Sequence, residues 1–124
     1  MAPSANYRED IVDIVGDRFS GYSEVRSGKI FGHPGFSIIG RFFCFAYEDG
    51  LAIKLAPSDY AKILELEEAD KFKPGGSPMG TWAVLTYIDA EEYLEHWEWL
   101  EKAMEYIVTD EAAPPKKRKK TKER

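Results

Sequence analysis

The least common side chains that could carry catalysis or bind a metal are two histidines and one cysteine: His33, His96 and Cys44. The two histidines lie far apart in the chain, and a metal site needs three or four suitable ligands. Cys44 could act as a nucleophile with His33 as its base. However, Cys44 stands between Phe43 and Phe45, where a cysteine is typically a small core residue. We therefore predict a non-enzymatic protein with no catalytic residue, metal site or cofactor.

A glycine-rich stretch, Gly75–Gly80, could be imagined to hold a phosphate. It lacks the GxxxxGK[ST] pattern, and a strand rather than a helix is expected after it. We interpret it as a connecting loop that places Met79 and Trp82 against the core.

Two aromatic residues, Trp99 and Tyr106, are seven positions apart and share a second face of the last predicted helix. Either another helix of the domain covers this face, or the pair forms an interface with a protein partner or in a homodimer. Both alternatives stay open from the sequence.

Charge divides the chain unevenly. Residues 1–113 hold ten Lys and Arg against 21 Asp and Glu, a net charge of −11, whereas residues 114–124 hold seven Lys and Arg against one Glu, a net charge of +6. Such a basic run is either a solvated tail or a weak, non-specific nucleic-acid contact, because no aromatic residue is interleaved to stack on bases. The candidate contacts are Lys116, Lys117, Arg118, Lys119, Lys120 and Lys122.

The elements that would position these groups begin with an antiparallel meander over residues 23–55. We predict a type II turn at residues 32–36, set by Pro34 and Gly35. A doubly covered central strand is expected at residues 42–47, with Phe42, Cys44 and Ala46 on one face and Phe43, Phe45 and Tyr47 on the other. Further reversals are predicted at Gly40-Arg41 and at Asp49-Gly50, the latter a type I′ turn.

Helical periodicity predicts a first helix over residues 6–19 with Ser4 as its cap, and a short helix from Ser58 to about residue 67. A last strand is expected at residues 81–88. Asp89 and Glu92 form a capping-box-like pair that opens a long helix reaching about residue 107.

These elements predict one α+β domain at residues 1–110, with an antiparallel sheet of about five strands, an N-terminal helix, a short middle helix and a long C-terminal helix. A disordered basic tail is expected at residues 111–124. The chain shows no secretory signal and no apolar stretch of membrane-spanning length, so we expect a cytoplasmic protein.

The order of several short motifs resembles the N-terminal domain of the TfoX/Sxy family. These are KIFG at residues 29–32, GRFFC at 40–44, DGLAIKL at 49–55 and SPMGTW at 77–82, and the likeness spans about residues 7–118. The resemblance implies a fold of the YjbR/MmcQ-like group and a role in transcription or competence regulation, with no established catalytic residues.

The sequence thus predicts a small interaction or regulatory module. A nucleic-acid-associated accessory protein that uses the basic tail is the alternative.

Overall fold

The computed structural model describes residues 6–109, so the predicted basic tail and Ser4 lie outside the described residues. In chain order the elements are α1 (Glu9–Phe19), β1 (Val25–Ile30), β2 (His33–Ile38), β3 (Arg41–Tyr47), β4 (Gly50–Lys54), α2 (Pro57–Ile63), β5 (Ala69–Lys71), β6 (Trp82–Leu85), α3 (Glu92–Glu95) and α4 (Glu98–Val108). The predicted α+β class with an antiparallel sheet is confirmed.

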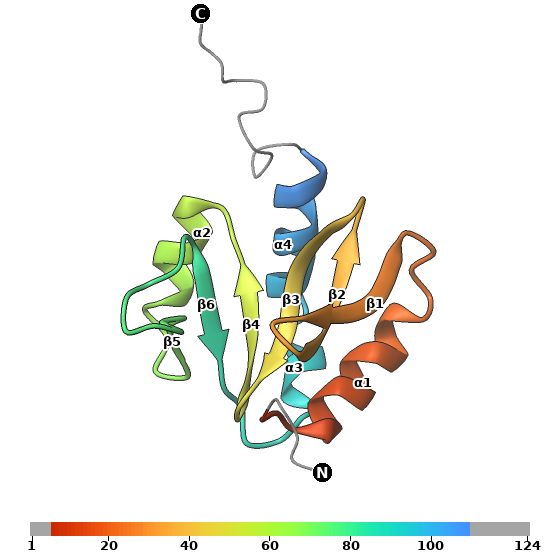
Figure 1. Ribbon diagram of the computed structural model, residues 1–124, viewed down its shortest axis with the longest axis horizontal. Helices are drawn as coiled ribbons and strands as arrows, with labels where there is room; N and C mark the ends of the chain where they lie inside the picture. The colour runs from red at the N-terminus through yellow and green to blue at the C-terminus, as the bar shows by residue number, and fades with distance from the viewer. Residues whose placement is uncertain (1–5, 110–124) are drawn as a thin grey trace, which may run out of the picture.

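The sheet has six strands in the order β1-β2-β3-β4-β6-β5, and all neighbouring strands are antiparallel. The helices lie on one side of this sheet, which we call the back, and leave the other side, the front, without helices (Figure 1). About five strands were predicted. The sixth, β5, has only three residues and lies just after the predicted short helix, where no strand was predicted.

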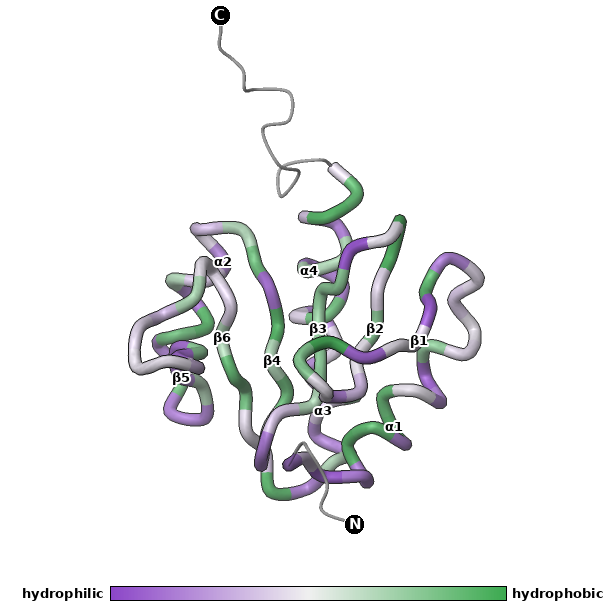
Figure 2. Tube along the Cα trace, viewed as in Figure 1, coloured by the Kyte–Doolittle hydropathy of each residue, from purple (hydrophilic) through white to green (hydrophobic). Residues whose placement is uncertain are grey.

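The main core lies between the back of the sheet and the helices. α1 contributes Ile11, Val15 and Phe19, three of the four residues that helical spacing places on one apolar face, whereas the fourth, Val12, is half-buried. β4 and β6 alternate as half-covered strands do, so Leu51 and Leu85 point to the back. Figure 2 shows that hydrophobic residues concentrate in the inner strands, whereas β1 is largely polar.

The predicted C-terminal helix is interrupted at His96, where φ is −119° and ψ is 42°. The interruption divides it into α3 and α4, and neither helix shows a side-chain cap, so the expected Asp89 cap is wrong. At the break the His96 ring stacks on Tyr87, with centroids 5.3 Å apart, and the buried Trp97 donates its indole N–H to the Tyr22 hydroxyl at 2.9 Å. The broken helix thereby brings two aromatic side chains into contact with distant segments.

The turns of the meander differ from the predicted ones. The first reversal is Phe31-Gly32, with φ of 57° and 81°, and not the predicted Pro34-Gly35 turn. Pro34 and Gly35 instead lie inside β2. Pro34 is tolerated there because β3 pairs with β2 only from Gly35 onward.

The β2–β3 and β3–β4 turns each lie one residue before the predicted position. Ile39-Gly40, with φ of 45° and 79°, joins β2 to β3, and Glu48-Asp49 joins β3 to β4. Gly50 therefore belongs to β4. It is required there by close packing, because an added Cβ would lie 2.7 Å from the Leu85 carbonyl oxygen. Ser58 makes no side-chain capping bond to α2, whose first residue is Pro57.

A β-bulge changes which side chains of β3 face the front. The pairing moves from Phe36–Cys44 to Ser37–Phe42, so Phe43 is the extra residue on β3. Phe43 and Cys44 therefore both pack in the main core, whereas Phe42 joins Phe45 and Tyr47 on the front. The prediction that this strand is covered on both sides is confirmed, but the predicted alternation of its side chains is wrong.

Gly28 and Gly35 are directly paired across β1 and β2, beneath the Phe42 ring. A Cβ on Gly28 would lie 3.1 Å from the ring, and one on Gly35 would lie 2.6 Å from the Cys44 carbonyl oxygen and 2.7 Å from the Phe45 Cβ. The pair thus leaves room for an aromatic ring, and β1 crosses in front of the neighbouring strands (Figure 1).

We predict that Gly35→Ala lowers the free energy of unfolding by about 2–3 kcal/mol, because the added methyl group overpacks a site enclosed by backbone. Urea denaturation measures the effect. Gly75→Ala is the matched control, since nothing lies within 4 Å of a Cβ added there; we expect a change of about 0.5 kcal/mol or less. Equal losses in both variants would contradict the close approach at Gly35.

Candidate functional site

A second, smaller hydrophobic cluster covers the front of the sheet. Its buried members are Phe45, Ala52, Phe72 and Trp82. The loop that follows β5 is tied down over them by main-chain hydrogen bonds, since Met79 N–H donates to the Phe72 carbonyl at 3.0 Å and Phe72 N–H donates to the Trp82 carbonyl at 3.0 Å. The interpretation of the glycine-rich stretch as a loop that places Met79 and Trp82 against the core is confirmed.

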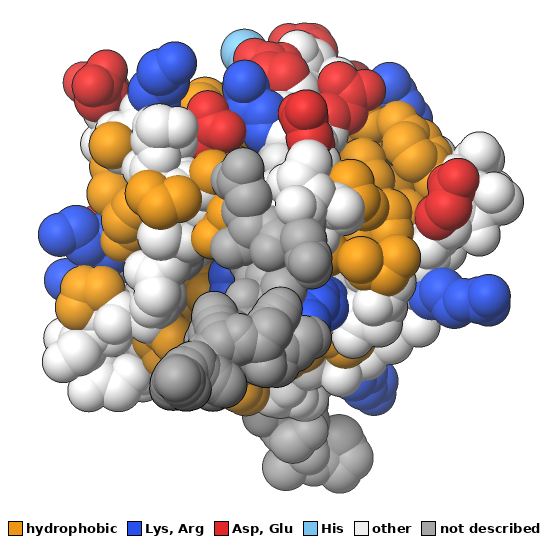
Figure 3. Space-filling model, turned by 90° about the horizontal axis from the view of Figure 1, so that it is seen from above, with side chains coloured by type: hydrophobic (Ala, Val, Ile, Leu, Met, Phe, Trp, Pro, Cys, Tyr) orange, Lys and Arg blue, Asp and Glu red, His pale blue; other side chains and the backbone are white. Residues whose placement is uncertain are grey.

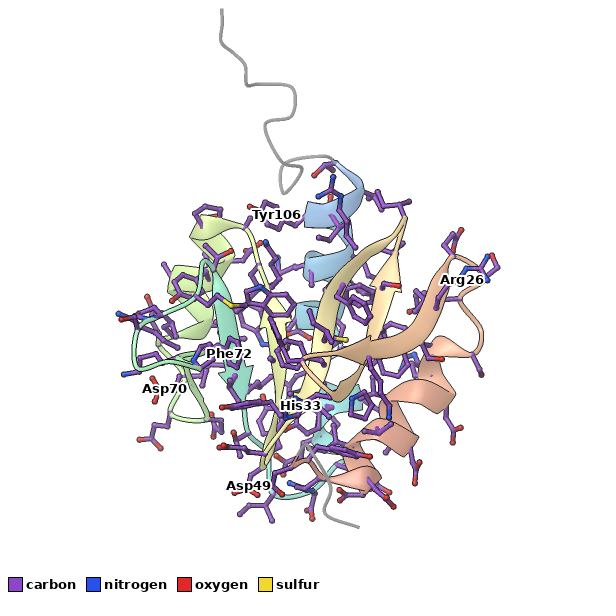
Figure 4. The ribbon with its side chains drawn as sticks, viewed as in Figure 1. Arg26, His33, Asp49, Asp70, Phe72 and Tyr106 are labelled. Atoms are coloured by element: carbon purple, nitrogen blue, oxygen red, sulfur yellow. The ribbon has the colours of Figure 1, made fainter. Side chains whose placement is uncertain are left out.

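A cavity of about 240 Å³ opens in this cluster, between the β1–β2 turn and the loop after β5. We call it the front pocket. Its accessible surface is entirely apolar, and its lining consists of Phe31, His33, Phe45, Tyr47, Phe72, Pro74 and Met79. Figure 4 shows His33 and Phe72 in front of the sheet, on the side away from α4.

The aromatic rings of the front pocket form a floor and a wall. Phe45 and Phe72 are 0% and 1% exposed and lie beneath the opening, with ring centroids 5.4 Å apart and planes at 81°. Phe31 is 61% exposed and rises beside them, 5.9 Å from Phe45. Tyr47 is half-buried at the rim, where burial and the nearby Glu48 carboxylate raise the pKa of its hydroxyl.

His33 completes the pocket at the start of β2. Its Nδ1 lies 3.0 Å from the Phe31 carbonyl oxygen, and because a carbonyl only accepts, this nitrogen carries the hydrogen. The ring packs against Tyr47, with centroids 5.2 Å apart, and Tyr7 approaches it edge-on at 6.5 Å. The hydrogen bond fixes the orientation of the imidazole relative to the strained turn.

The sheet separates His33 from Cys44. His33 lies on the front, whereas Cys44 is fully buried in the main core at the back, where burial strongly raises the pKa of the thiol. A raised pKa keeps the thiol protonated at neutral pH, which removes the nucleophilic thiolate. The described residues therefore do not bring this pair together. In residues 6–109 no cluster of three or more His, Cys, Asp and Glu could hold a metal.

The aromatic pair of the last helix is partly covered by its own chain. Trp99 is half-buried against the main core, and Tyr106 lies beside α2, where Lys102 pairs with Asp59 at 3.8 Å. Acidic side chains gather on the helix side of the molecule, as Figure 3 shows from above. The role of Trp99 and Tyr106 as a partner interface stays a prediction.

The front also carries a half-buried cation. The Nζ atom of Lys54 lies 5.9 Å from the centroid of the Trp82 ring, and burial together with the nearby Arg41 lowers the pKa of the ammonium. In the described part of the chain Lys54 makes no ion pair with a carboxylate. The aromatic floor of the front is thus in contact with an ammonium group.

Comparisons with protein-family models, with curated proteins and with solved structures find no match for this chain. Of the helices in residues 6–109, none has the length and hydropathy needed to span a membrane. The geometry of the front pocket is therefore the basis on which a function can be proposed.

Sequence reasoning missed most of this pocket. The aromatic content of Phe42–Tyr47 was apparent, and alternation placed Phe45 and Tyr47 on one face, but the bulge that moves Phe42 to that face leaves no periodic signal. The signal that could have indicated the pocket is Phe31-Gly32. A two-residue turn of this kind usually holds Asn-Gly or Asp-Gly, and here a bulky residue precedes the glycine.

We predict that Ile39→Asn raises the free energy of unfolding by about 0.5–1 kcal/mol, because Ile39 is 62% exposed at a φ of 45° that favours Asn. Phe31→Asn should raise the free energy of unfolding by less. Phe31 has the same backbone conformation, but its ring also packs on Phe45, and the substitution removes this contact. Urea denaturation of both variants checks the order. Clear destabilisation by Ile39→Asn would show that no strain is relieved.

Proposed function

We propose that this protein is a small non-enzymatic interaction module that binds an apolar group of a partner in the front pocket. The observation that carries the proposal is an entirely apolar cavity, open to solvent, on the face of the sheet that the helices leave uncovered. Cavities of this kind are the usual places where proteins bind small groups.

The conformation of Phe31 supports the same site. A bulky residue at positive φ costs about 1–2 kcal/mol relative to the right-handed regions, and such strain tends to concentrate at binding sites. Among residues 6–109, Phe31 is also one of the few large hydrophobic side chains that are well exposed. Ile39 has the same conformation and exposure but does not line the front pocket, so it is the natural comparison.

The more specific expectations stay predictions. A regulatory role of the TfoX/Sxy kind rests on motif order alone, a homodimer rests on Trp99 and Tyr106, and a cytoplasmic location rests on the sequence. The front pocket is compatible with each of them and does not depend on any of them.

We predict that Phe31→Asn removes a specific partner from a pull-down out of native lysate, whereas Ile39→Asn retains it, because only Phe31 borders the front pocket. Mass spectrometry compares the proteins captured by wild type and by the two variants, with and without nuclease. Identical captures by both variants would exclude the front pocket as the site.

A second candidate function is weak, non-specific association with nucleic acid. It is favoured by the +6 charge of residues 114–124, which contrasts with the −11 of the rest and could neutralise several phosphates. These residues lie outside the described part of the chain, so the argument rests on their sequence alone.

We predict that deleting residues 114–124 abolishes retention on DNA in low salt, since the remaining chain is acidic. The salt dependence of elution from immobilised DNA is the measurement. In a control variant only Glu123 is substituted. Because this removes one negative charge from the tail, binding to DNA should stay the same or become slightly stronger. Unchanged retention after the deletion would rule out the tail as a nucleic-acid contact.

A further inference from the structure

The walls of the front pocket restrict the chemistry of anything that enters it. Because its accessible surface is entirely apolar, an entering N–H or O–H group would lose its hydrogen bonds to water without replacement. Two kinds of group avoid this loss: hydrocarbon, and an ammonium whose hydrogens are replaced by methyl groups. The first would need only apolar walls, and the second also needs groups that attract a positive charge.

The rings of the front pocket supply that attraction. The planes of Phe45, Tyr47 and Phe72 meet at 86°, 90° and 81°, so the three rings form the corner of a box. Phe31 adds an exposed side at 70° to Phe45. Aromatic faces attract cations within about 6 Å of the ring centre, and this attraction strengthens where water is excluded. On the same face of the sheet, the Lys54 ammonium already lies over the Trp82 ring.

The charges around the pocket favour a positive group as well. A polar cavity of about 340 Å³ adjoins the front pocket through Tyr47, and its lining includes the carboxylates of Glu48, Asp49 and Asp70. Two lysines, Lys71 and Lys73, lie there too, so the carboxylates exceed the ammonium groups by one. Figure 4 shows Asp49 and Asp70 on either side of this region, and residues 1–113 as a whole carry a net charge of −11.

The volumes of the two cavities indicate what kind of molecule the positive group belongs to. Pockets for whole drug-sized ligands span roughly 300–1,000 Å³. The front pocket, at about 240 Å³, is suited to a head group, and the polar cavity beside it offers carboxylate and lysine partners for a main chain. A peptide fits this arrangement better than a free small ion does.

We propose that the front pocket binds the trimethylated ammonium of a lysine side chain on a protein partner. This rests on the proposed function and specifies the group that the pocket accepts. Phe31 and Tyr47 contact the methyl groups from the sides, Phe45 and Phe72 lie beneath them, and the polar cavity beyond Tyr47 takes the flanking residues of the partner.

Isothermal titration of the full chain tests the proposal with three short peptides that share Gly and Ala flanks. Their central residue is trimethyl-lysine, unmodified lysine, or the neutral isostere in which carbon replaces the ammonium nitrogen. We expect the trimethyl-lysine peptide to bind about fivefold or more tightly than the isostere, because only the cation gains from the rings. Unmodified lysine should bind more weakly than trimethyl-lysine, since it loses water from its N–H groups.

Two variants and one further probe complete the design. Phe31→Asn should weaken binding of the trimethyl-lysine peptide about tenfold, and Ile39→Asn should leave it unchanged. Tetramethylammonium should bind more weakly than the peptide, because it cannot reach the polar cavity. Equal affinity of this ion and the peptide would overturn the assignment to a protein partner.

The outcomes separate this inference from the proposed function. If the neutral isostere binds as tightly as trimethyl-lysine and Phe31→Asn weakens both, the cation assignment is wrong and the pocket accepts hydrocarbon. If no peptide binds, and if the pull-down does not distinguish Phe31→Asn from Ile39→Asn, both the inference and the proposed function are wrong.

Discussion

The extra residue in β3 decides which aromatic side chains face the front of the sheet. Without the bulge at Phe43, strict alternation would place Phe42 on the same side as Cys44, in the main core. With it, Phe42 lies on the front beside Phe45 and Tyr47. The ring of Phe42 can lie there only because the facing pair, Gly28 and Gly35, carries no side chains. One inserted residue and two glycines therefore place Phe43 in the main core and Phe42 in the front cluster.

The two hydrophobic clusters differ in how they cover the two sides of the sheet. At the back, buried aliphatic and aromatic side chains from α1, α4 and the inner strands form a continuous core. At the front, the β1–β2 hairpin and the loop after β5 extend over the sheet, and the space between them is the front pocket. The back can therefore stabilise the domain while the front remains open, which is a common division between a rigid scaffold and binding loops.

Sequence patterns predicted the structural features that depend on the local spacing of apolar residues. The stripe of α1, the central strand covered on both sides and the meander itself all follow from the spacing of apolar residues and turn formers. The bulge, the three-residue β5 and the helix break at His96 could not be predicted, since each is set by contacts with residues distant in sequence. The front pocket was missed for the same reason, because its walls come from three separate segments.

The choice of residue at Phe31 is hard to explain by folding alone. A two-residue reversal with positive φ at both positions folds best with Asn or Gly first, and the chain has Phe there, mostly exposed and before Gly32. The ring recovers some energy on Phe45, but more than half of its surface still faces water. Ile39 has the same backbone cost and exposure, but Phe31 also borders the front pocket, and the proposed contact with a partner rests on this combination. The front pocket beneath it is where that contact would lie.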